Sequence, residues 1–418
     1  MALACCLTAP LAAGALPAFV CTEARQPAPR GQAAAGSRLM LVSPAGRRSL
    51  APGFFVSADA CVSFDARQVL FAGRRTARDP WQIWELELGG GTLRRVTAFQ
   101  EDAVRPVYLP GGRIAYARRT PDGFQIETAP LAGGEPERIT FSPGDHLPAE
   151  VLRDGRILFE APQRDGRDLY TVYTDGSGVE TYRCDHGHDR YAARQLATGD
   201  LIFHDGARLG RFTSALARQV DVPLPAGEFA GPVAEAGPGE WLVSYRRDGH
   251  APFAVYRWSP ETGTLALAAA AAGGAHLLRP VTVAERPVPL RHPSALGNRE
   301  GGNVLCLNAY TSRAPFAAGS VAAVRVYTAG EGGVSRLLGE TRVEPDGSFF
   351  VQVPSERPLR FEVVDSARRV LQAERDWFWM RRGEQRVCVG CHAGPERAPE
   401  NAVPAVLLRS DVPVRMLE

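Results

Sequence analysis

The sequence shows almost no imbalance of charge: among its 418 residues, 48 Lys and Arg stand against 46 Asp and Glu, for a formal net charge of +2. Such a chain lacks the basic surface that binds a phosphate backbone, so we expect no nucleic-acid partner. Sustained helical periodicity is equally scarce, whereas 43 Gly, 33 Pro and many short alternating runs indicate turns and strands. The sequence therefore predicts an all-β protein, and its length allows two or three domains.

Charge is absent altogether from residues 1–22, MALACCLTAPLAAGALPAFVCT. This apolar run and the polar, Ala-rich spacer after it predict a secretory leader over residues 1–37 and a periplasmic or otherwise exported protein, although the usual basic start of a leader is missing. An unstructured apolar N-terminus and a retained membrane anchor, interrupted by Pro10 and Pro17, are the alternatives. No later segment is long and apolar enough to span a bilayer, so we expect no stable transmembrane domain.

A repeat of about 43 residues organises the first two-thirds of the chain. Five short strands share one pattern, and their aromatic residues lie 45, 43, 44 and 42 positions apart: Phe71, Tyr116, Phe159, Phe203 and Tyr245. Tight Gly turns and one longer polar loop join four strands in each unit, which is typical of a propeller blade. We predict a six-bladed β-propeller over residues 38–295, with 38–51 and 277–290 pairing as the sixth blade; five or seven blades is the alternative.

Histidines gather in loops that a propeller would place on one face. If the strands of a blade are named a to d, the b–c and d–a loops share a face, and six of the eight histidines fall in them: His146, His186, His188, His204, His250 and His276. Because loops on a rigid scaffold often carry function, we predict a site where His146, His186, His188 or Asp189 moves protons. A dedicated metal site in CDHGHDR, residues 184–190, and a merely solvated loop are the alternatives.

The repeat ends at a turn-rich linker, HPSALGNREGG, residues 292–302. Strands then resume without the 43-residue period, among them NVLCLNAY, VAAVRVYT and PDGSFFVQVPSERPLRFEVVD. Alternation and the turn at Asp346–Gly347 predict a small antiparallel β-sandwich over residues 303–380. Residues 381–418 remain as a separate motif and tail.

Two of the eight cysteines stand three positions apart, directly before a histidine: Cys388, Cys391 and His392 spell C-x-x-C-H. This spacing is the attachment signature of c-type haem, in which each thiol adds to one vinyl group and the histidine offers its imidazole to iron. A structural zinc site would need a second ligand pair at metal spacing, and a thioredoxin-like motif would need a βαβ context; the sequence has neither nearby. We therefore predict one covalent haem c at these residues.

With these segments assembled, the chain resembles the hydrazine synthase alpha subunit-like family, over roughly residues 40–400. The residues that carry the resemblance are RDGRILF-type propeller strands, NVLCLNAY, PDGSFFVQVPSERPLRFEVVD and RGEQRVCVGCH. The resemblance implies a TolB/WD40-like propeller, a β middle domain and a haem c near the propeller. In that family the motif histidine and a cysteine matching Cys306 are associated with zinc, and a tyrosine four residues beyond the histidine serves the iron. Here that position is Glu396, so we expect His392 to be the iron ligand. Cys306 is then either a buried strand cysteine or a tentative metal ligand near the haem.

Three functions follow as expectations. The first is a redox enzyme acting on a small molecule at an open iron position near the propeller face. The second is an electron-transfer subunit, whose second iron ligand is a propeller histidine or Met380; both readings imply a redox partner protein. The third is a non-redox envelope binding module. Because the second haem domain of the synthase subunit is missing from this sequence, we do not expect hydrazine synthesis.

Overall fold

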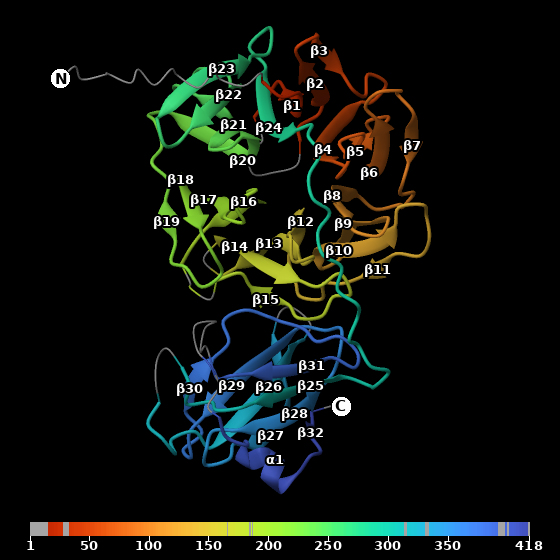
Figure 1. The fold of residues 1–418 in the computed structure, drawn as a ribbon. Helices are drawn as coiled ribbons and strands as arrows, with labels where there is room; N and C mark the ends of the chain where they lie inside the picture. Colours follow the sequence, from red (N-terminus) through yellow and green to blue (C-terminus); the bar gives the residue numbers. More distant parts are fainter. Residues whose placement is uncertain are drawn as a thin grey trace, which may run out of the picture.

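The computed structural model describes residues 16–27, 33–164, 166–183, 185, 187–312, 316–330, 334–391, 398 and 401–416. Their regular structure consists of strands and the short helix α1 (Ala405–Arg409), so the predicted all-β class is confirmed. The strands form four-stranded sheets that divide between a ring and a two-layer domain (Figure 1). Within the described residues, no helix is long and apolar enough to cross a membrane.

Six of the sheets surround a central channel, and their innermost strands contact one another in a closed ring, as in a β-propeller (Figure 1). Five of these blades are continuous in sequence. Their strands are β4 (Val56–Val62), β5 (Gln68–Arg74), β6 (Gln82–Glu87) and β7 (Leu93–Arg95); β8 (Ala103–Leu109), β9 (Arg113–Thr120), β10 (Gly123–Pro130) and β11 (Glu137–Arg138); β12 (Leu147–Val151), β13 (Ile157–Gln163), β14 (Gly166–Val172) and β15 (Glu180–Thr181); β16 (Arg190–Gln195), β17 (Leu201–Asp205), β18 (Arg208–Phe212) and β19 (Val220–Asp221); and β20 (Glu228–Gly237), β21 (Glu240–Arg246), β22 (Ala254–Ser259) and β23 (Thr264–Ala269).

The second strand of each continuous blade is the one that the repeat identified. These strands pair on both sides, and their aromatic residues are buried: Phe71, Tyr116, Phe159, Phe203 and Tyr245. A strand covered on both edges and by neighbouring blades favours a near-continuous apolar run, because each buried side chain adds hydrophobic stabilisation. This burial explains why the aromatic positions recur with the blade period.

The ring is closed by a blade built from both ends of the array: β24 (His276–Thr282), β1 (Phe19–Ala24), β2 (Arg38–Ser43) and β3 (Gly46–Ser49), in that order. The structure differs here from the sequence prediction, which gave residues 19–24 to the leader and a second strand to the segment before residue 290. Phe19 lies opposite both Val42 and Thr282, and the first three residues of β1 are fully buried. An apolar run that pairs with two strands belongs to the folded blade.

The second domain is a β-sandwich. One sheet has the order β31 (Gln385–Cys388), β25 (Gly302–Cys306), β28 (Phe349–Val353) and β32 (Val414–Arg415); the other has the order β27 (Ser335–Arg342), β26 (Ala323–Ala329), β29 (Leu359–Val364) and β30 (Val370–Ala373). The purely antiparallel arrangement that the sequence predicted is wrong at two edges, because β31 pairs with β25 and β32 with β28 in parallel. Parallel neighbours need a crossover connection, and long returning segments supply it. The segment after residue 380 is thus part of the sandwich rather than a separate tail.

The sandwich docks on the outer rim of the propeller, beside β11 and β15 (Figure 1). Trp379 is 1% exposed and donates from Nε1 to the Gly176 carbonyl oxygen at 3.1 Å. Arg381 donates to the Glu137 carboxylate at 2.6 Å and to the Arg138 carbonyl at 2.7 Å. A buried indole flanked by charge-assisted hydrogen bonds makes this junction a packed interface rather than a loose tether.

Candidate functional site

The first two cysteines of the candidate site end neighbouring strands. Cys388 ends β31 and lies opposite Cys306, the last residue of β25, in the parallel register. After Cys388 the chain turns at Gly390, where a Cβ atom would lie 2.1 Å from the Thr311 carbonyl oxygen, so only glycine fits. This tight turn brings Cys391 back beside Cys306.

All three thiols line one small cavity between the two sheets. Its volume is about 50 Å³, and its other walls are Val324, Phe349, Phe361, Val363, Gln372, Glu374 and Gly390. The edge strands β31 and β30 both contribute residues, so the cavity lies toward one open side of the sandwich. Cys306 is buried, whereas Cys388 and Cys391 are partly exposed.

The thiols are free, and the pKa values of two of them are raised. The five cysteines within the described residues, which include Cys21 and Cys61, are all free. A hydrogen bond to Cys391, followed by burial, raises the pKa of the Cys306 thiol well above its usual value. Burial raises the pKa of the Cys388 thiol to about 11. Cys306 and Cys388 are therefore neutral at physiological pH.

These residues fit haem attachment in part. Two partly exposed free thiols at the right spacing face the same cavity. A cavity of about 50 Å³ is far below the roughly 300–1,000 Å³ of ordinary cofactor pockets, so a porphyrin ring would lie outside it, along the open edge. His392 and Glu396 lie outside the described residues, and among those that are described no group of three His, Cys, Asp or Glu is placed to hold a metal ion.

His146, a predicted proton-transfer residue, lies at the domain junction. It is 2% exposed, its Nε2 lies 2.9 Å from the Ser142 hydroxyl, and its ring packs against Phe159 and Trp379. Burial, reinforced by Arg138, lowers the pKa of His146 to about 3. This imidazole is therefore neutral at working pH and is suited to hydrogen bonding rather than to acid catalysis.

A second cavity of about 350 Å³ lies beside His146, between the propeller and the sandwich segment that joins β30 to β31. Three arginines and several aromatic rings line it: Arg164, Arg360, Arg375, Phe159, Tyr170, Trp377 and Trp379. Arg360 lines this cavity, whereas its neighbour Phe361 lines the thiol cavity. Likewise, Arg375 lines this cavity and its neighbour Glu374 lines the thiol cavity. Because successive strand residues point to opposite faces, the two cavities flank the same edge of the sandwich.

His188 and His204 serve local structure in the blade of β16 and β17. His188 Nδ1 lies 2.9 Å from the Asp205 carboxylate, and the Asp189 backbone N–H donates to the same carboxylate at 3.1 Å. His186 and Cys184 lie outside the described residues. His204 contacts the Gly231 carbonyl oxygen at 2.9 Å. The structure places His146 apart from this group, at the junction with the sandwich.

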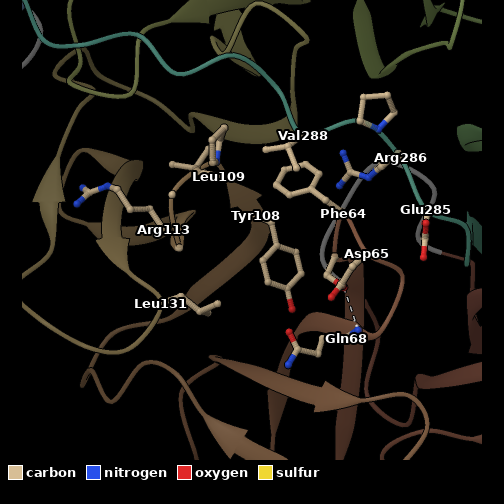
Figure 2. Close-up of a pocket in the computed structure, with 15 residues that line it drawn as sticks. Phe64, Asp65, Gln68, Tyr108, Leu109, Arg113, Leu131, Glu285, Arg286 and Val288 are labelled. Carbon is tan, nitrogen blue, oxygen red and sulfur yellow. Dashed lines mark hydrogen bonds between the residues drawn. The ribbon is translucent and has the colours of Figure 1, made fainter.

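Sequence reasoning missed two large cavities, which lie on the opposite face of the propeller, where the a–b turns are. One, of about 690 Å³, occupies the propeller channel, and an open groove of similar size lies next to it. Figure 2 shows the groove, with Phe64 between Tyr108 and the linker residues Arg286 and Val288. Arg286 donates to the Val62 carbonyl at 3.1 Å, which fixes the linker across the channel mouth. The sequence did contain a signal for the channel cavity. One position near the middle of each innermost strand carries a charged residue in some blades.

The protein is therefore a β-propeller joined to a β-sandwich, and the sandwich carries a C-x-x-C pair at its open edge. Residues 309–393 match the family model of the hydrazine synthase alpha subunit middle domain. Among solved structures, Kuenenia stuttgartiensis hydrazine synthase is similar with a TM-score of 0.81 and 16% identity, over 95% of this chain and 72% of that chain. TolB from Acinetobacter baumannii is similar to the propeller part, with a TM-score of 0.51 and 13% identity, over 63% of this chain and 66% of that one.

No curated protein matches this chain closely enough to be counted as a relative. The predicted resemblance to the hydrazine synthase alpha subunit-like family is nevertheless confirmed, by sequence in the middle domain and by fold over nearly the whole chain.

Proposed function

We propose that this chain is an exported single-haem c-type protein that carries out a redox reaction on a small molecule. Cys388 and Cys391 are the attachment thiols, and His392 is the iron ligand. When bound, the haem supplies one-electron chemistry that amino-acid side chains lack. The observation that carries the proposal is the pair of free thiols at C-x-x-C-H spacing, facing one cavity at the open edge of a hydrazine synthase-type middle domain.

The cavity of about 350 Å³ beside His146, called the junction cavity from here on, is the proposed substrate site. Its three arginines outnumber its one carboxylate, Asp376, and so favour a polar or anionic small molecule, while Trp377 and Trp379 add aromatic surface to its wall. Neutral His146 offers the cavity wall a hydrogen-bonding group whose protonation does not change between pH 5 and 9. Because Arg360 and Phe361 are adjacent on β29, only one strand separates this cavity from the thiols.

The position of Met380 favours the enzyme reading over the electron-transfer reading. Its side chain is fully buried and packs over the backbone of Gly302, where an added Cβ would lie 2.7 Å from the Met380 Cβ. Met380 lines neither the thiol cavity nor the junction cavity among the described residues. A methionine held in the sandwich core is a poor second ligand, so a propeller histidine is the candidate that the electron-transfer reading would need.

The test is expression with a c-type maturation system, followed by purification from the periplasmic fraction. Wild type and the control variant Cys306→Ala should each carry one covalent haem, because Cys306 is not an attachment thiol. Cys388→Ala and Cys391→Ala should each lose one thioether bond, and the double variant should lose covalent haem entirely. A wild-type protein without haem would overturn the proposal and leave a non-redox envelope binding module.

The ferric spectrum then decides between the two redox readings. A high-spin spectrum that shifts on adding cyanide or nitric oxide is expected for the enzyme. A low-spin spectrum indifferent to both ligands would instead identify an electron-transfer subunit that serves a protein partner. Elemental analysis of the same samples tests zinc: loss of zinc in Cys306→Ala alone would assign Cys306 as a metal ligand.

A further inference from the structure

The propeller channel is lined by the innermost strands, and each of them carries a register shift near its middle. In five strands one residue of this bulge has a left-handed backbone: Asp59 (φ 56°), Arg105 (φ 54°), Ala192 (φ 53°), Gly231 (φ 70°) and Arg279 (φ 55°). A residue with a side chain costs roughly 1–2 kcal/mol in this conformation, whereas glycine adopts it freely. Arginine at two of these positions is therefore locally unfavourable, which indicates that its side chain is needed there.

The charged bulge residues share one side of the channel. Arg279, Asp59 and Arg105 come from three consecutive blades, those of β24, β4 and β8. The other three blades present small residues at the same height, of which Ala192 and Gly231 are two. This division leaves open space opposite the charges, and the channel cavity of about 690 Å³ falls within the usual range for small-molecule sites.

Asp59 satisfies only a small part of the hydrogen-bonding capacity of the two arginines. Arg279 Nη1 lies 3.3 Å and Arg105 Nε 3.5 Å from the same oxygen, Asp59 Oδ1. Each guanidinium has five N–H donors in a planar fork that matches a carboxylate or phosphate. Asp59, Arg105 and Arg279 all line the cavity, and their side chains keep 12%, 12% and 15% exposure.

Four arginines and four carboxylates line the cavity, so its charges balance, but positive groups gather around Arg279. The charges that act on Arg279 are those of Arg105 and Arg194, opposed by Asp59 and the buried Glu160, which accepts the Ala192 N–H at 2.8 Å. Burial and the neighbouring Arg105 lower the pKa of Arg279 to about 10, and Asp59 and Glu160 oppose that shift. Nearer the mouth, the carboxylates of Glu150 and Glu235 accept backbone N–H groups of the a–b turn, and Glu285 and Arg286 of the linker lie beside them.

We propose that the propeller channel binds a small molecule through an oxyanion group, a carboxylate or a phosphate, held between Arg105 and Arg279. The anion approaches from the a–b face, past the linker at Arg286, and shares the two guanidinium forks with Asp59. Bound there, it gives the two guanidinium groups a second anionic partner beside the one oxygen of Asp59 that they share. This site is separate from the haem thiols and does not depend on haem.

The experiment is isothermal titration calorimetry of the full chain with two probes, succinate and inorganic phosphate, at constant ionic strength. We expect saturable one-to-one binding of at least one probe, and the probe that binds more tightly identifies the oxyanion class. Arg105→Gln and Arg279→Gln should weaken binding at least tenfold. Arg48→Gln, which changes an exposed arginine on β3 of the same closing blade as Arg279, should bind as wild type does.

Two further variants separate a binding site from a structural ion pair. Asp59→Asn removes the competing carboxylate and should tighten binding several-fold. Arg279→Lys keeps the charge beside Asp59 but loses the fork, so it should weaken binding while leaving the unfolding temperature close to wild type. The proposal is overturned if neither probe saturates below about 10 mM, a dissociation constant worth roughly 2.7 kcal/mol. It is also overturned if the arginine variants bind as wild type does, or if Asp59→Asn weakens binding together with them.

Discussion

The thiol cavity of the sandwich and the channel cavity of the propeller are built on opposite plans. The first has about 50 Å³ and is walled by three thiols and mostly apolar side chains, with Gln372 and Glu374 at the edge of the two sheets. The second has about 690 Å³ and is lined by charged residues that recur at one position of a repeated strand. One edge pairing and one tight turn, each of which occurs once, bring the thiols together, whereas the channel varies one position of a strand that every blade repeats.

Breaking the packed junction between the propeller and the sandwich should have the largest effect on stability. Trp379→Ala removes a fully buried indole and its hydrogen bond to Gly176, at a cost of about 3–5 kcal/mol in unfolding free energy. We expect one denaturant transition for the wild type, because the junction is packed, and two for Trp379→Ala, one for each domain. Trp377→Ala, a half-buried neighbour, is the control and should leave one transition. One unchanged transition in Trp379→Ala would show that the junction contributes little.

Burial of the Cys388 thiol should lower the rate at which it is alkylated. With its pKa raised to about 11, Cys388 in haem-free protein should react with iodoacetamide at pH 8 roughly 100-fold more slowly than the same cysteine in a short peptide, because the thiolate is the nucleophile. The rate should climb steadily as pH rises toward 11. Peptide-mapping mass spectrometry measures both rates, and a rate equal to that of the peptide would contradict the buried thiol.

A smaller, pH-dependent effect is expected at His146. Its pKa is about 3 when folded and near 6.5 when unfolded, so the unfolded chain binds the proton more readily below pH 6.5. Stability is therefore complete above pH 6.5 and falls as pH decreases, by about 2 kcal/mol at pH 5 from this residue alone. His146→Gln should remove that part of the slope between pH 8 and pH 5. An identical slope in both proteins would mean that His146 titrates normally.

The smallest effect is expected at the far edge of the sandwich. Arg415 on β32 forms an exposed ion pair with Glu300 at 3.5 Å, with 64% and 77% of their side chains accessible. Arg415→Ala should change the free energy of unfolding by less than about 0.5 kcal/mol, because such pairs are screened by solvent. Urea unfolding provides the value against which the loss in Trp379→Ala is compared. A loss above about 1 kcal/mol would show that this edge contributes more than its contacts indicate.

Much of the propeller could be predicted because its repeated strands bury one aromatic residue each, as at Phe71 and Tyr116. The strand at Phe19 could not, since an apolar run with no charge has the composition of a leader as well as of a doubly paired strand. In the candidate site, the spacing of Cys388 and Cys391 was readable, but the third thiol beside them arrives through a parallel pairing that no local pattern indicates. His146 was found for its loop position, while its burial under Trp379 depends on domain docking.

The closing blade combines strands from both ends of the propeller, and this affects the order in which the protein folds. Strands β1, β2 and β3 leave the ribosome first, but the inner strand that completes their sheet, β24, begins about 230 residues later, at His276. Until then β1 presents an unpaired edge, and its pairing with β24 closes the longest loop in the ring. Ring closure should therefore be the slow step, and in pulsed hydrogen exchange the amides shared by β1 and β24 should gain protection after those of the five continuous blades.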